Sequence, residues 1–437
     1  MFFLPLSVLF TVWPLFLGLA VLMLGAGLQG TLLGVRATLE GFPTATIGVV
    51  MSCYYVGYLV GTIAAPRLIR SVGHIRVFAA LAAVASAAAV SQAVFVFPFA
   101  WGVTRLVSGL CFAGIYVVAE SSLNERATSA TRARLLALYM VVIYLGLGSG
   151  QFLLLLADPR SPAPFMLISA LISLAMVPMV LSAQPAPAVA ARRSIRIREL
   201  YRVAPVGLIT VTVAGLITSV IFSIGPVYAR LNGLDTAGIA TFMAVSIFAG
   251  VVTQYPIGAL ADHMDRRIVI AAVCLVAAIV ASGLTVFPEI PRPLYLLLAA
   301  LFSGLVLTIY SLGLSHVNDR IEPGQMVAAS GALLLLNGGG AILGPMLAAR
   351  LMAAWGPAAY FGTLASLNGA LALYCLWRKV RRVAAPVAAR GPFIKVQPQP
   401  CASVNDAQWL GAAGDAPPGT LAAASRPPKD DGLSTTP

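Results

Sequence analysis

Charged side chains are scarce in this chain. Only 10% of its 437 residues are Asp, Glu, Lys or Arg, whereas 59% are hydrophobic. Soluble globular proteins carry about 25% charged residues, and no soluble core could enclose this much apolar surface. The apolar residues come in long blocks, and a bilayer core of about 30 Å needs roughly 20 residues of helix. The shortage of charge therefore excludes a soluble protein and predicts an all-α membrane protein.

Histidine and cysteine are also sparse, which limits the possible chemistry. The chain has three histidines and five cysteines, with no C-x-x-C pair and no H-E-x-x-H sequence. We therefore expect no metal site, no disulfide framework and no cofactor. An intramembrane enzyme would need a nucleophile beside a base, or a metal cluster, and an ATP-driven pump would need a G-x-x-x-x-G-K-[ST] loop. Neither set is present, so the chain is not expected to be an enzyme.

Twelve apolar blocks are separated by charged residues, proline or glycine. Six precede the basic segment "AQPAPAVAARRSIRIRELYRVAP" and six follow it, which predicts 12 transmembrane helices in two six-helix bundles. The tail is dense in Pro, Ala and Gly and cannot bury enough apolar surface to fold. The predicted division is an N-terminal bundle at 1–182, a cytoplasmic linker at 183–205, a C-terminal bundle at 206–377 and a disordered cytoplasmic tail at 378–437.

Basic residues are distributed unevenly between the two ends of the blocks. With both termini in the cytoplasm, the cytoplasmic connections hold most of the Lys and Arg, as such loops usually do. The net charge of +13 thus indicates topology and not nucleic-acid binding. The excess of Arg over Lys favours a bacterial source, so we expect a multi-pass protein of the bacterial inner membrane. The arginines predicted on the opposite side are few: Arg36, Arg160, Arg230, Arg292 and Arg350.

The two halves repeat each other at a fixed offset. "LNERA" in the first half corresponds to "VNDRI" in the second, and a G-x-x-x-G pair follows each of them. Glycines four residues apart let helix backbones approach closely. Parallel repeats joined by a cytoplasmic linker are typical of transporters with a site at the repeat interface. The paired glycines are Gly146 and Gly150 in the first half, and Gly340 and Gly344 in the second.

A short charged connection, "GALADHMDRR", lies between the eighth and ninth blocks. A glycine is followed four residues later by an acid and then by two arginines, and the fourth block has an arginine followed four residues later by a glycine. These patterns resemble the major facilitator superfamily, over about residues 10–380. With "YVVAESSLN" after them, they look most like its poorly characterised YcaD-like branch. The residues that carry the resemblance are Gly258, Asp262, Arg266, Arg267, Arg105 and Gly109.

The resemblance implies a pseudo-symmetric pair of bundles that moves a small organic solute by alternating access, with proton-coupled efflux as one form. It names no substrate. The alternatives are a non-coupled facilitator or channel, a membrane sensor and, more distantly, an intramembrane enzyme. The expected partners are the lipid bilayer, a small-molecule substrate and protons.

Charged residues at the cytoplasmic face are expected to hold the bundles together in one state. Asp262 lies at the cytoplasmic end of the eighth block, and the fifth block begins at the same face. Arg132 and Arg134 add to the positive charge at the N-terminus of the fifth helix, which could bind an acid. The first-half connection lacks the acid, so a reversed pair of basic and acidic residues is expected there. The alternative is that these charges only set topology. The first-half motif and the reversed pair comprise Gly61, Arg67, Arg70, Gly73, Asp319 and Glu322.

Arg105 lies well inside the fourth block, where a charge costs at least about 2.5–3.5 kcal/mol on insertion scales. It should face the bundle interior, where it contacts substrate, tunes a proton site or binds backbone carbonyls; the remaining option is that it snorkels to the interface. Phe112 and Tyr116 share its helix face. Glu120 is too far along the helix to pair with it, and either carries a proton or forms an ordinary ion pair.

Further polar side chains on apolar blocks are candidates to line a central cavity, each with an interhelical hydrogen bond as the alternative. In the family, helices 1, 4, 7 and 10 line the cavity, which favours the candidates on those blocks. Because few are charged, an uncharged or amphipathic solute is expected, although Arg105 leaves room for an anion. The candidates besides Arg105 are Gln29, Tyr54, Tyr58, Tyr144, Gln151, Thr218, Tyr310 and Asn337.

Overall fold

The computed structural model describes residues 6–126, 131–181, 197–287, 289–321 and 326–381, and their regular structure is helical. The first half comprises α1 (Leu6–Leu39), α2 (Thr44–Val72), α3 (His74–Val94), α4 (Pro98–Arg126), α5 (Arg132–Gly150) with a 3₁₀ turn η1 (Gln151–Leu155), and α6 (Ala163–Leu181). The second comprises α7 (Ile197–Val203), α8 (Pro205–Leu231), α9 (Thr236–His263), α10 (Arg266–Val286), α11 (Arg292–Leu307), α12 (Ile309–Asn318), α13 (Met326–Trp355) and α14 (Ala359–Arg381).

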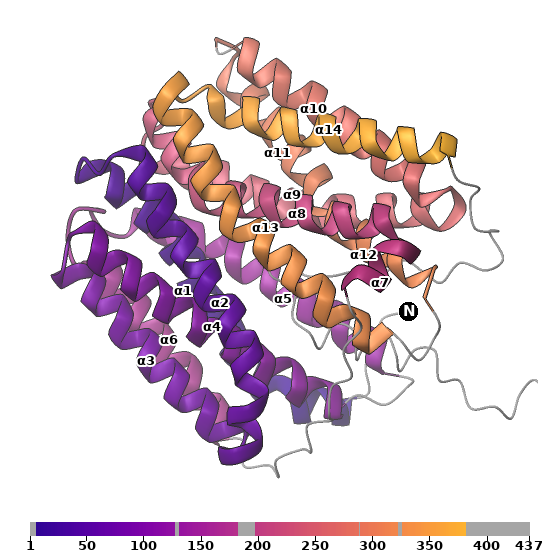
Figure 1. The fold of residues 1–437 in the computed structure, drawn as a ribbon. Coiled ribbons are helices and arrows are strands. Elements are labelled where there is room, and N and C mark those ends of the chain that lie inside the picture. Colours follow the sequence, from indigo (N-terminus) through magenta and orange to yellow (C-terminus); the bar gives the residue numbers. More distant parts are fainter. Residues whose placement is uncertain (1–5, 127–130, 182–196, 288, 322–325, 382–437) are drawn as a thin grey trace, which may run out of the picture.

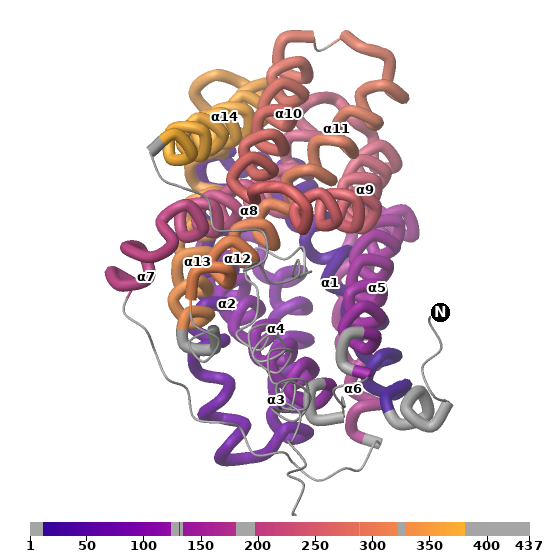
Figure 2. Tube along the Cα trace, turned by 90° about the vertical axis from the view of Figure 1, so that its right-hand side faces the viewer, coloured from indigo at the N-terminus to yellow at the C-terminus, as the bar shows by residue number. Residues whose placement is uncertain are grey.

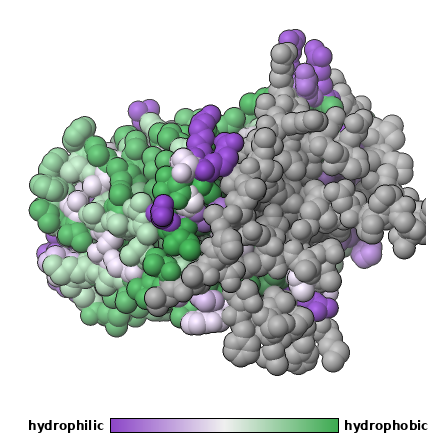
Figure 3. Space-filling view, turned by 90° about the horizontal axis from the view of Figure 1, so that it is seen from below, coloured by the Kyte–Doolittle hydropathy of each residue, from purple (hydrophilic) through white to green (hydrophobic). Residues whose placement is uncertain are grey.

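Twelve stretches of these helices are long and apolar enough to cross a membrane, with α11 and α12 forming one of them together. The predicted fold class, an all-α membrane protein with twelve spans, is therefore confirmed. The outward faces carry large apolar side chains, including Phe99, Val252 and Trp355, which are 77%, 73% and 75% exposed. The part of the surface that Figure 3 colours is accordingly mostly hydrophobic. Lipid tails, and not water, are the solvent that such a surface requires.

Two bundles make up the molecule, α1–α6 and α8–α14, and Figures 1 and 2 show them as the indigo-to-purple and the pink-to-yellow halves. They join mainly where α2 packs on α13, α1 on α8, and α5 with η1 on α9. Near the face that bears few arginines, Gly34 lies against Pro226 and Gly48 against Ala349. In Figure 1 the bundles fan apart from this face toward the other, which we call the arginine-rich end. The halves are thus held together at the arginine-poor end.

The repeated glycine pairs allow the same close contact between two helices in both halves. Gly146 and Gly150 let α5 lie directly on the backbone of α1, where a Cβ atom would overlap atoms of the neighbouring helix. Gly340 and Gly344 do the same for α13 on α8. The predicted close approach is confirmed, and each half uses it to fix its fifth helix on its first.

The turns at the arginine-rich end differ between the repeats. Gly73 joins α2 to α3 with φ +95°, a conformation that glycine adopts without steric cost. The second half instead uses Asp265, whose carboxylate accepts a hydrogen bond from the backbone N–H of Arg267 at 3.0 Å and caps α10. The two copies of the motif therefore make the same reversal with different chemistry.

Three local features were not predicted. The linker contains the short helix α7, and α14 continues to Arg381, so that residues 378–381, assigned to the tail, are helical. The tenth span is interrupted at Thr308, whose hydroxyl donates to the carbonyl of Leu305 at 2.7 Å. Hydroxyl back-bonding of this kind competes with the helix backbone and favours a bend. The remaining linker residues, 183–196, and the tail from 382 onward lie outside the described residues.

Candidate functional site

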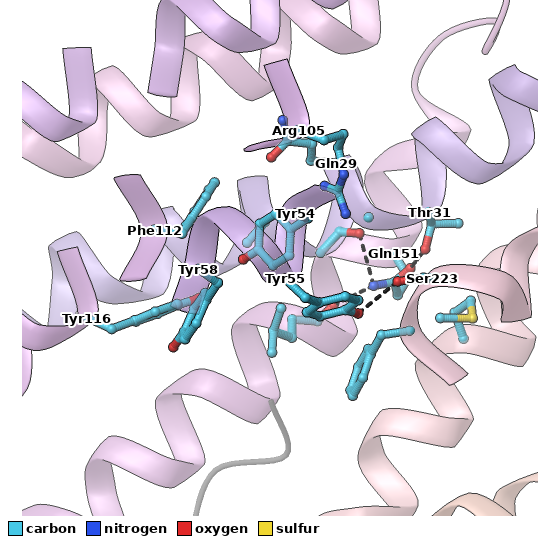
Figure 4. A pocket seen from close by; sticks show the side chains of 16 residues that line it. Gln29, Thr31, Tyr54, Tyr55, Tyr58, Arg105, Phe112, Tyr116, Gln151 and Ser223 are labelled. Atoms are coloured by element: carbon cyan, nitrogen blue, oxygen red, sulfur yellow. Dashed lines mark hydrogen bonds between the residues drawn. The ribbon is translucent and has the colours of Figure 1, made fainter. Parts of the chain in front are cut away.

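A pocket opens between the two halves at mid-depth of the spans. Residues of α1, α2, α4 and α5 with η1 form most of its wall, and Phe222, Ser223 and Met243 of α8 and α9 complete it (Figure 4). The cavity that it encloses has a volume of about 80 Å³, which is smaller than most small-molecule sites, so the halves must part further to hold a solute. The pocket belongs to both halves, so any motion of one half against the other changes its shape.

The crossing of α2 and α4 positions the first wall of this pocket. Neither Gly57 nor Gly109 has room for a Cβ atom, because the carbonyl oxygens of Leu106 and Tyr54 occupy those places. Such contact brings the two backbones as close as helices can pack. Tyr54 and Arg105, one from each helix, consequently meet in the pocket.

Arg105 is the main charge in the pocket. Its side chain is 5% exposed, and its guanidinium carbon lies 4.3 Å from the centroid of the Tyr54 ring. Among the described residues it forms no hydrogen bond or ion pair, and its buried Nε has no acceptor. Of the three inward roles considered from the sequence, the structure therefore shows no backbone-carbonyl contact, and the side chain does not reach the interface.

Aromatic rings continue from this point toward the arginine-rich end. Tyr54 lies 6.0 Å from Tyr58 and 6.5 Å from Phe112, and Tyr116 lies 6.2 Å from Tyr58 and 6.3 Å from Phe112, between ring centroids. Separations of 4.5–7 Å are those of favourable ring pairs. The wall beside Arg105 is thus a rigid apolar surface with phenolic oxygens on it.

The opposite wall is polar and internally satisfied. The Gln151 amide donates to the carbonyls of Gly27 at 3.1 Å and Leu147 at 3.0 Å, and its oxygen accepts from the Thr31 hydroxyl. Gln29 donates to Gln92 at 3.2 Å. The Gln151 bonds fix η1 to α1, the Gln29 bond joins α1 to α3, and both amides are held at the pocket surface.

One hydrogen bond crosses the pocket between the halves. The Tyr55 hydroxyl of α2 and the Ser223 hydroxyl of α8 lie 2.7 Å apart, and both side chains are buried (Figure 4). Sequence reasoning missed Tyr55, Thr31 and Ser223. The run of three tyrosines within five residues of α2 was the available signal, but periodicity does not tell which of two adjacent tyrosines faces the partner half.

Five of the predicted cavity residues line this pocket and four do not. Gln29, Tyr54, Tyr58, Arg105 and Gln151 lie in its wall. The other four are buried elsewhere in the bundles: Tyr144, Thr218, Tyr310 and Asn337.

Three of those four make contacts within the bundles that are visible in the structure. The Asn337 amide donates to the carbonyl of Val211 at 3.0 Å and so ties α13 to α8. The Thr218 hydroxyl bonds the carbonyl of Ala214 in its own helix at 2.7 Å. Tyr144 packs over Gly250 of α9. The expectation that helices 7 and 10 supply Thr218 and Tyr310 to the cavity does not hold for this pocket.

The second-half motif forms a buried ion cluster. The Arg266 guanidinium, 1% exposed, lies 2.9 Å from Asp319 at the end of α12 and 3.7 Å from Asp262 of α9, and it donates to the Ser315 carbonyl. Gly258 is buried one turn before Asp262. Asp265 holds Arg267 at 2.8 Å. The motif thus locks α9, α10 and α12 together within its own half.

The first-half motif is arranged differently. Gly61 packs on the Leu110 backbone of α4. Arg70 donates to the carbonyl of Pro66 at 3.1 Å, and neither it nor Arg67 forms an ion pair with a described residue. The reversed pair with Asp319 is therefore not formed in this conformation, and Glu322 lies outside the described residues.

The other charged candidates lie near the arginine-rich end. Glu120 is 1% exposed and accepts a hydrogen bond from Tyr139 at 2.9 Å. Arg134 is exposed on the first turn of α5. The side chain of Arg132 lies outside the described residues. The distance along α4 keeps Glu120 away from the Arg105 pocket.

Comparison with known proteins agrees with this architecture. The profile described as Major Facilitator Superfamily matches residues 15–337 and 251–418. The uncharacterised MFS-type transporter YcaD of Escherichia fergusonii is 29% identical over 373 residues, and that of Salmonella typhi 30% identical, each match covering 85% of this chain and 96% of the relative.

Solved structures show the same fold. The nucleoside transporter NupG has a TM-score of 0.70 at 14% identity, with 84% of this chain and 98% of that one covered. A bacterial homologue of the human lysosomal transporter Spinster, in an inward-facing and unoccupied conformation, has a TM-score of 0.67 at 12% identity, with 85% and 95% covered.

Two six-helix bundles around a shared mid-membrane pocket define a multi-pass membrane transporter. The chain belongs to the major facilitator superfamily.

Proposed function

We propose that the protein is a secondary active transporter that moves a small organic solute by alternating access. The observation that carries the proposal is the pocket lined from both halves, with the Tyr55–Ser223 hydrogen bond across it. A site at such an interface opens to one side or the other as the halves pivot. The contacts at the arginine-poor end correspond to a state that is closed there.

We infer that the arginine-rich end faces the cytoplasm of a bacterial inner membrane, with both termini on that side. The support is the uneven distribution of Lys and Arg between the connections. Glu120, which is 1% exposed and accepts a hydrogen bond from Tyr139, is our candidate to carry a coupling proton.

The proposal is tested on purified protein. A solute panel is screened for thermal stabilisation, because ligands that bind the folded state raise its apparent stability. Stabilising solutes are then tested in proteoliposomes, with and without a proton gradient. Saturable uptake with counterflow is expected. Uptake that is linear in concentration and shows no counterflow would favour a channel, and binding without any uptake would favour a sensor.

Gly30 provides a test of the pocket itself. It lies in the wall of the pocket, and a Cβ atom there would meet nothing within 4 Å. Gly30→Leu is therefore expected to fill the pocket without strain, leaving the unfolding temperature unchanged or higher and abolishing stabilisation by ligand. Gly362→Leu on α14, which also has open space around it, is the control. Undiminished ligand binding by Gly30→Leu would show that the solute binds elsewhere.

The proposed mechanism includes a contact that closes the two halves at the arginine-rich end, between Asp262 of α9 and the first turn of α5; we call this contact the latch. Helices α5 and α9 run antiparallel, with Phe248 over Gly148 and Tyr144 over Gly250. The same register, continued along both helices, brings Asp262 opposite the first turn of α5. The amides and positive end of that turn would bind the carboxylate when the halves close there.

Asp262→Asn is expected to weaken this latch. A hydrogen bond to a charged group contributes about 1.5–3 kcal/mol, so we expect the rate of solute exchange to fall roughly tenfold, since 1.4 kcal/mol is a factor of ten. Initial exchange rates in proteoliposomes measure this. Asp235→Asn makes the same charge change at the arginine-poor end, where Asp235 caps α9, and should leave the rate near that of the wild type. Equal rates for both variants would remove the latch from the mechanism.

A further inference from the structure

The Nε atom of Arg105 is a buried donor that lacks an acceptor among the described residues. The side chain lies in the pocket wall, is 5% exposed, and makes no hydrogen bond or ion pair with a described residue. Buried polar groups in native proteins are nearly always hydrogen-bonded, and an exception calls for an explanation. The contact with the Tyr54 ring links α4 to α2 but supplies no hydrogen-bond acceptor. An acceptor brought by a ligand explains both the burial and the missing partner.

The orientation of the guanidinium suits one kind of acceptor. Its central carbon lies over the Tyr54 ring, 4.3 Å from the ring centroid, and Figure 4 shows the two side chains next to each other. The N–H groups of a guanidinium lie in its own plane, where two of them can meet the two oxygens of a carboxylate. The close crossing of α2 and α4 at Gly57 and Gly109 fixes both partners of this contact.

The charge of the pocket limits the charge of the ligand. Arg105 is the single Asp, Glu, Lys or Arg among the described residues that line it. One unit of positive charge in a largely desolvated site is neutralised by one carboxylate. A dianion such as a phosphate ester would leave a second charge buried without a partner, which is costly.

The rest of the pocket fits an apolar body. Phe112 and Tyr116 continue the wall from Arg105, and Phe222 and Met243 face it from the second half. We propose that the solute is an organic monoacid, whose carboxylate binds Arg105 and whose aromatic or branched apolar part lies among these side chains. This inference rests on the proposed transport function, because it assigns the substrate class of the same pocket.

Matched pairs of acids and amides test the inference. Thermal unfolding of the purified protein is followed with benzoate, phenylacetate, salicylate and 4-methylvalerate, and with the amide of each. We expect at least one acid to raise the unfolding temperature of the wild type, and its amide not to. Arg105→Gln should weaken binding of that acid at least 30-fold, and Arg105→Lys, which keeps the charge but not the fork, should weaken it less. Arg292→Gln, at an arginine that is 57% exposed at the arginine-poor end and lies outside the pocket wall, should not change it.

The stability of the ligand-free variant separates binding from scaffolding. Removal of an unpaired buried charge should leave the unfolding temperature of Arg105→Gln unchanged or higher. If the unfolding temperature fell while acid binding was retained, Arg105 would have a structural role between the helices, and the inference would be overturned. No stabilisation by any acid would also overturn it. If only neutral solutes were transported saturably, the protein would still be a transporter, but the proposal that its solute is an acid would be wrong. If acids bound through Arg105 but were not taken up, the proposed binding site would stand and the proposed transport function would be wrong.

Discussion

Gly109→Ala is expected to destabilise the protein strongly and to abolish solute binding. The new methyl group would overlap the carbonyl oxygen of Tyr54, which is backbone and cannot rotate away. Overpacking of a close helix contact costs about 1–3 kcal/mol and more where nothing can yield, so we place this change at the upper end of that range. Arg105 lies one turn from Gly109, and its separation from the Tyr54 ring would increase.

The control for this change is Gly102→Ala on the same helix. There the added Cβ would lie 3.6 Å from the Cys53 sulfur, an ordinary contact. Unfolding temperature and ligand-induced stabilisation of the two variants are compared with the wild type. We expect Gly102→Ala to match the wild type in both. If Gly109→Ala also matched it, the α2–α4 crossing would not be what positions the pocket.

Asp319→Leu is expected to have the second large effect, a loss of roughly 3–5 kcal/mol of stability, as when one partner of a buried ion pair is removed. Arg266 is 1% exposed and would retain only the more distant Asp262 of its two described carboxylate partners. The buried charge would then be poorly compensated, and α9, α10 and α12 would lose their common anchor. Chemical or thermal unfolding in detergent measures the loss.

A second substitution separates charge from packing. The double variant Arg266→Met, Asp319→Leu removes both charges and should recover much of the lost stability, because apolar replacements of buried pairs are often neutral. Arg292→Gln, at an exposed ion pair, should change stability too little to resolve. A double variant as unstable as the single one would show that the cluster acts through specific bonds and not through charge balance.

The sequence predicted the membrane architecture because length and apolarity decide it. A run of about 20 apolar residues is long enough to cross the bilayer, and within the bilayer it must form a helix so that its backbone groups are hydrogen-bonded. The interruption at Thr308 and the helix α7 were missed since both depend on local hydrogen bonds and packing that composition does not record. The paired glycines were informative because their spacing and their repetition point to the same helix contact.

The pocket was predicted only in part for a geometric reason. Periodicity shows which residues share a face of a helix, but a helix in a bundle has several buried faces. Asn337 faces α8 and not the pocket, whereas Tyr55 reaches Ser223 across the halves. Arg105 was the stronger prediction, since a charge in an apolar helix must face protein or water.

The central claim is that the two halves pivot about the shared pocket. It is tested most directly by spin-label distances in lipid nanodiscs, with one cysteine pair at each end in a background without the five native cysteines. Ser71 with Met264 reports on the arginine-rich end, and Arg160 with Asn232 on the arginine-poor end; all four are exposed, and each pair spans the halves. We expect two distance populations at each end, with Asp262→Asn shifting them in opposite senses at the two ends. A single unchanging distance at both ends, or changes of the same sense, would contradict the pivot.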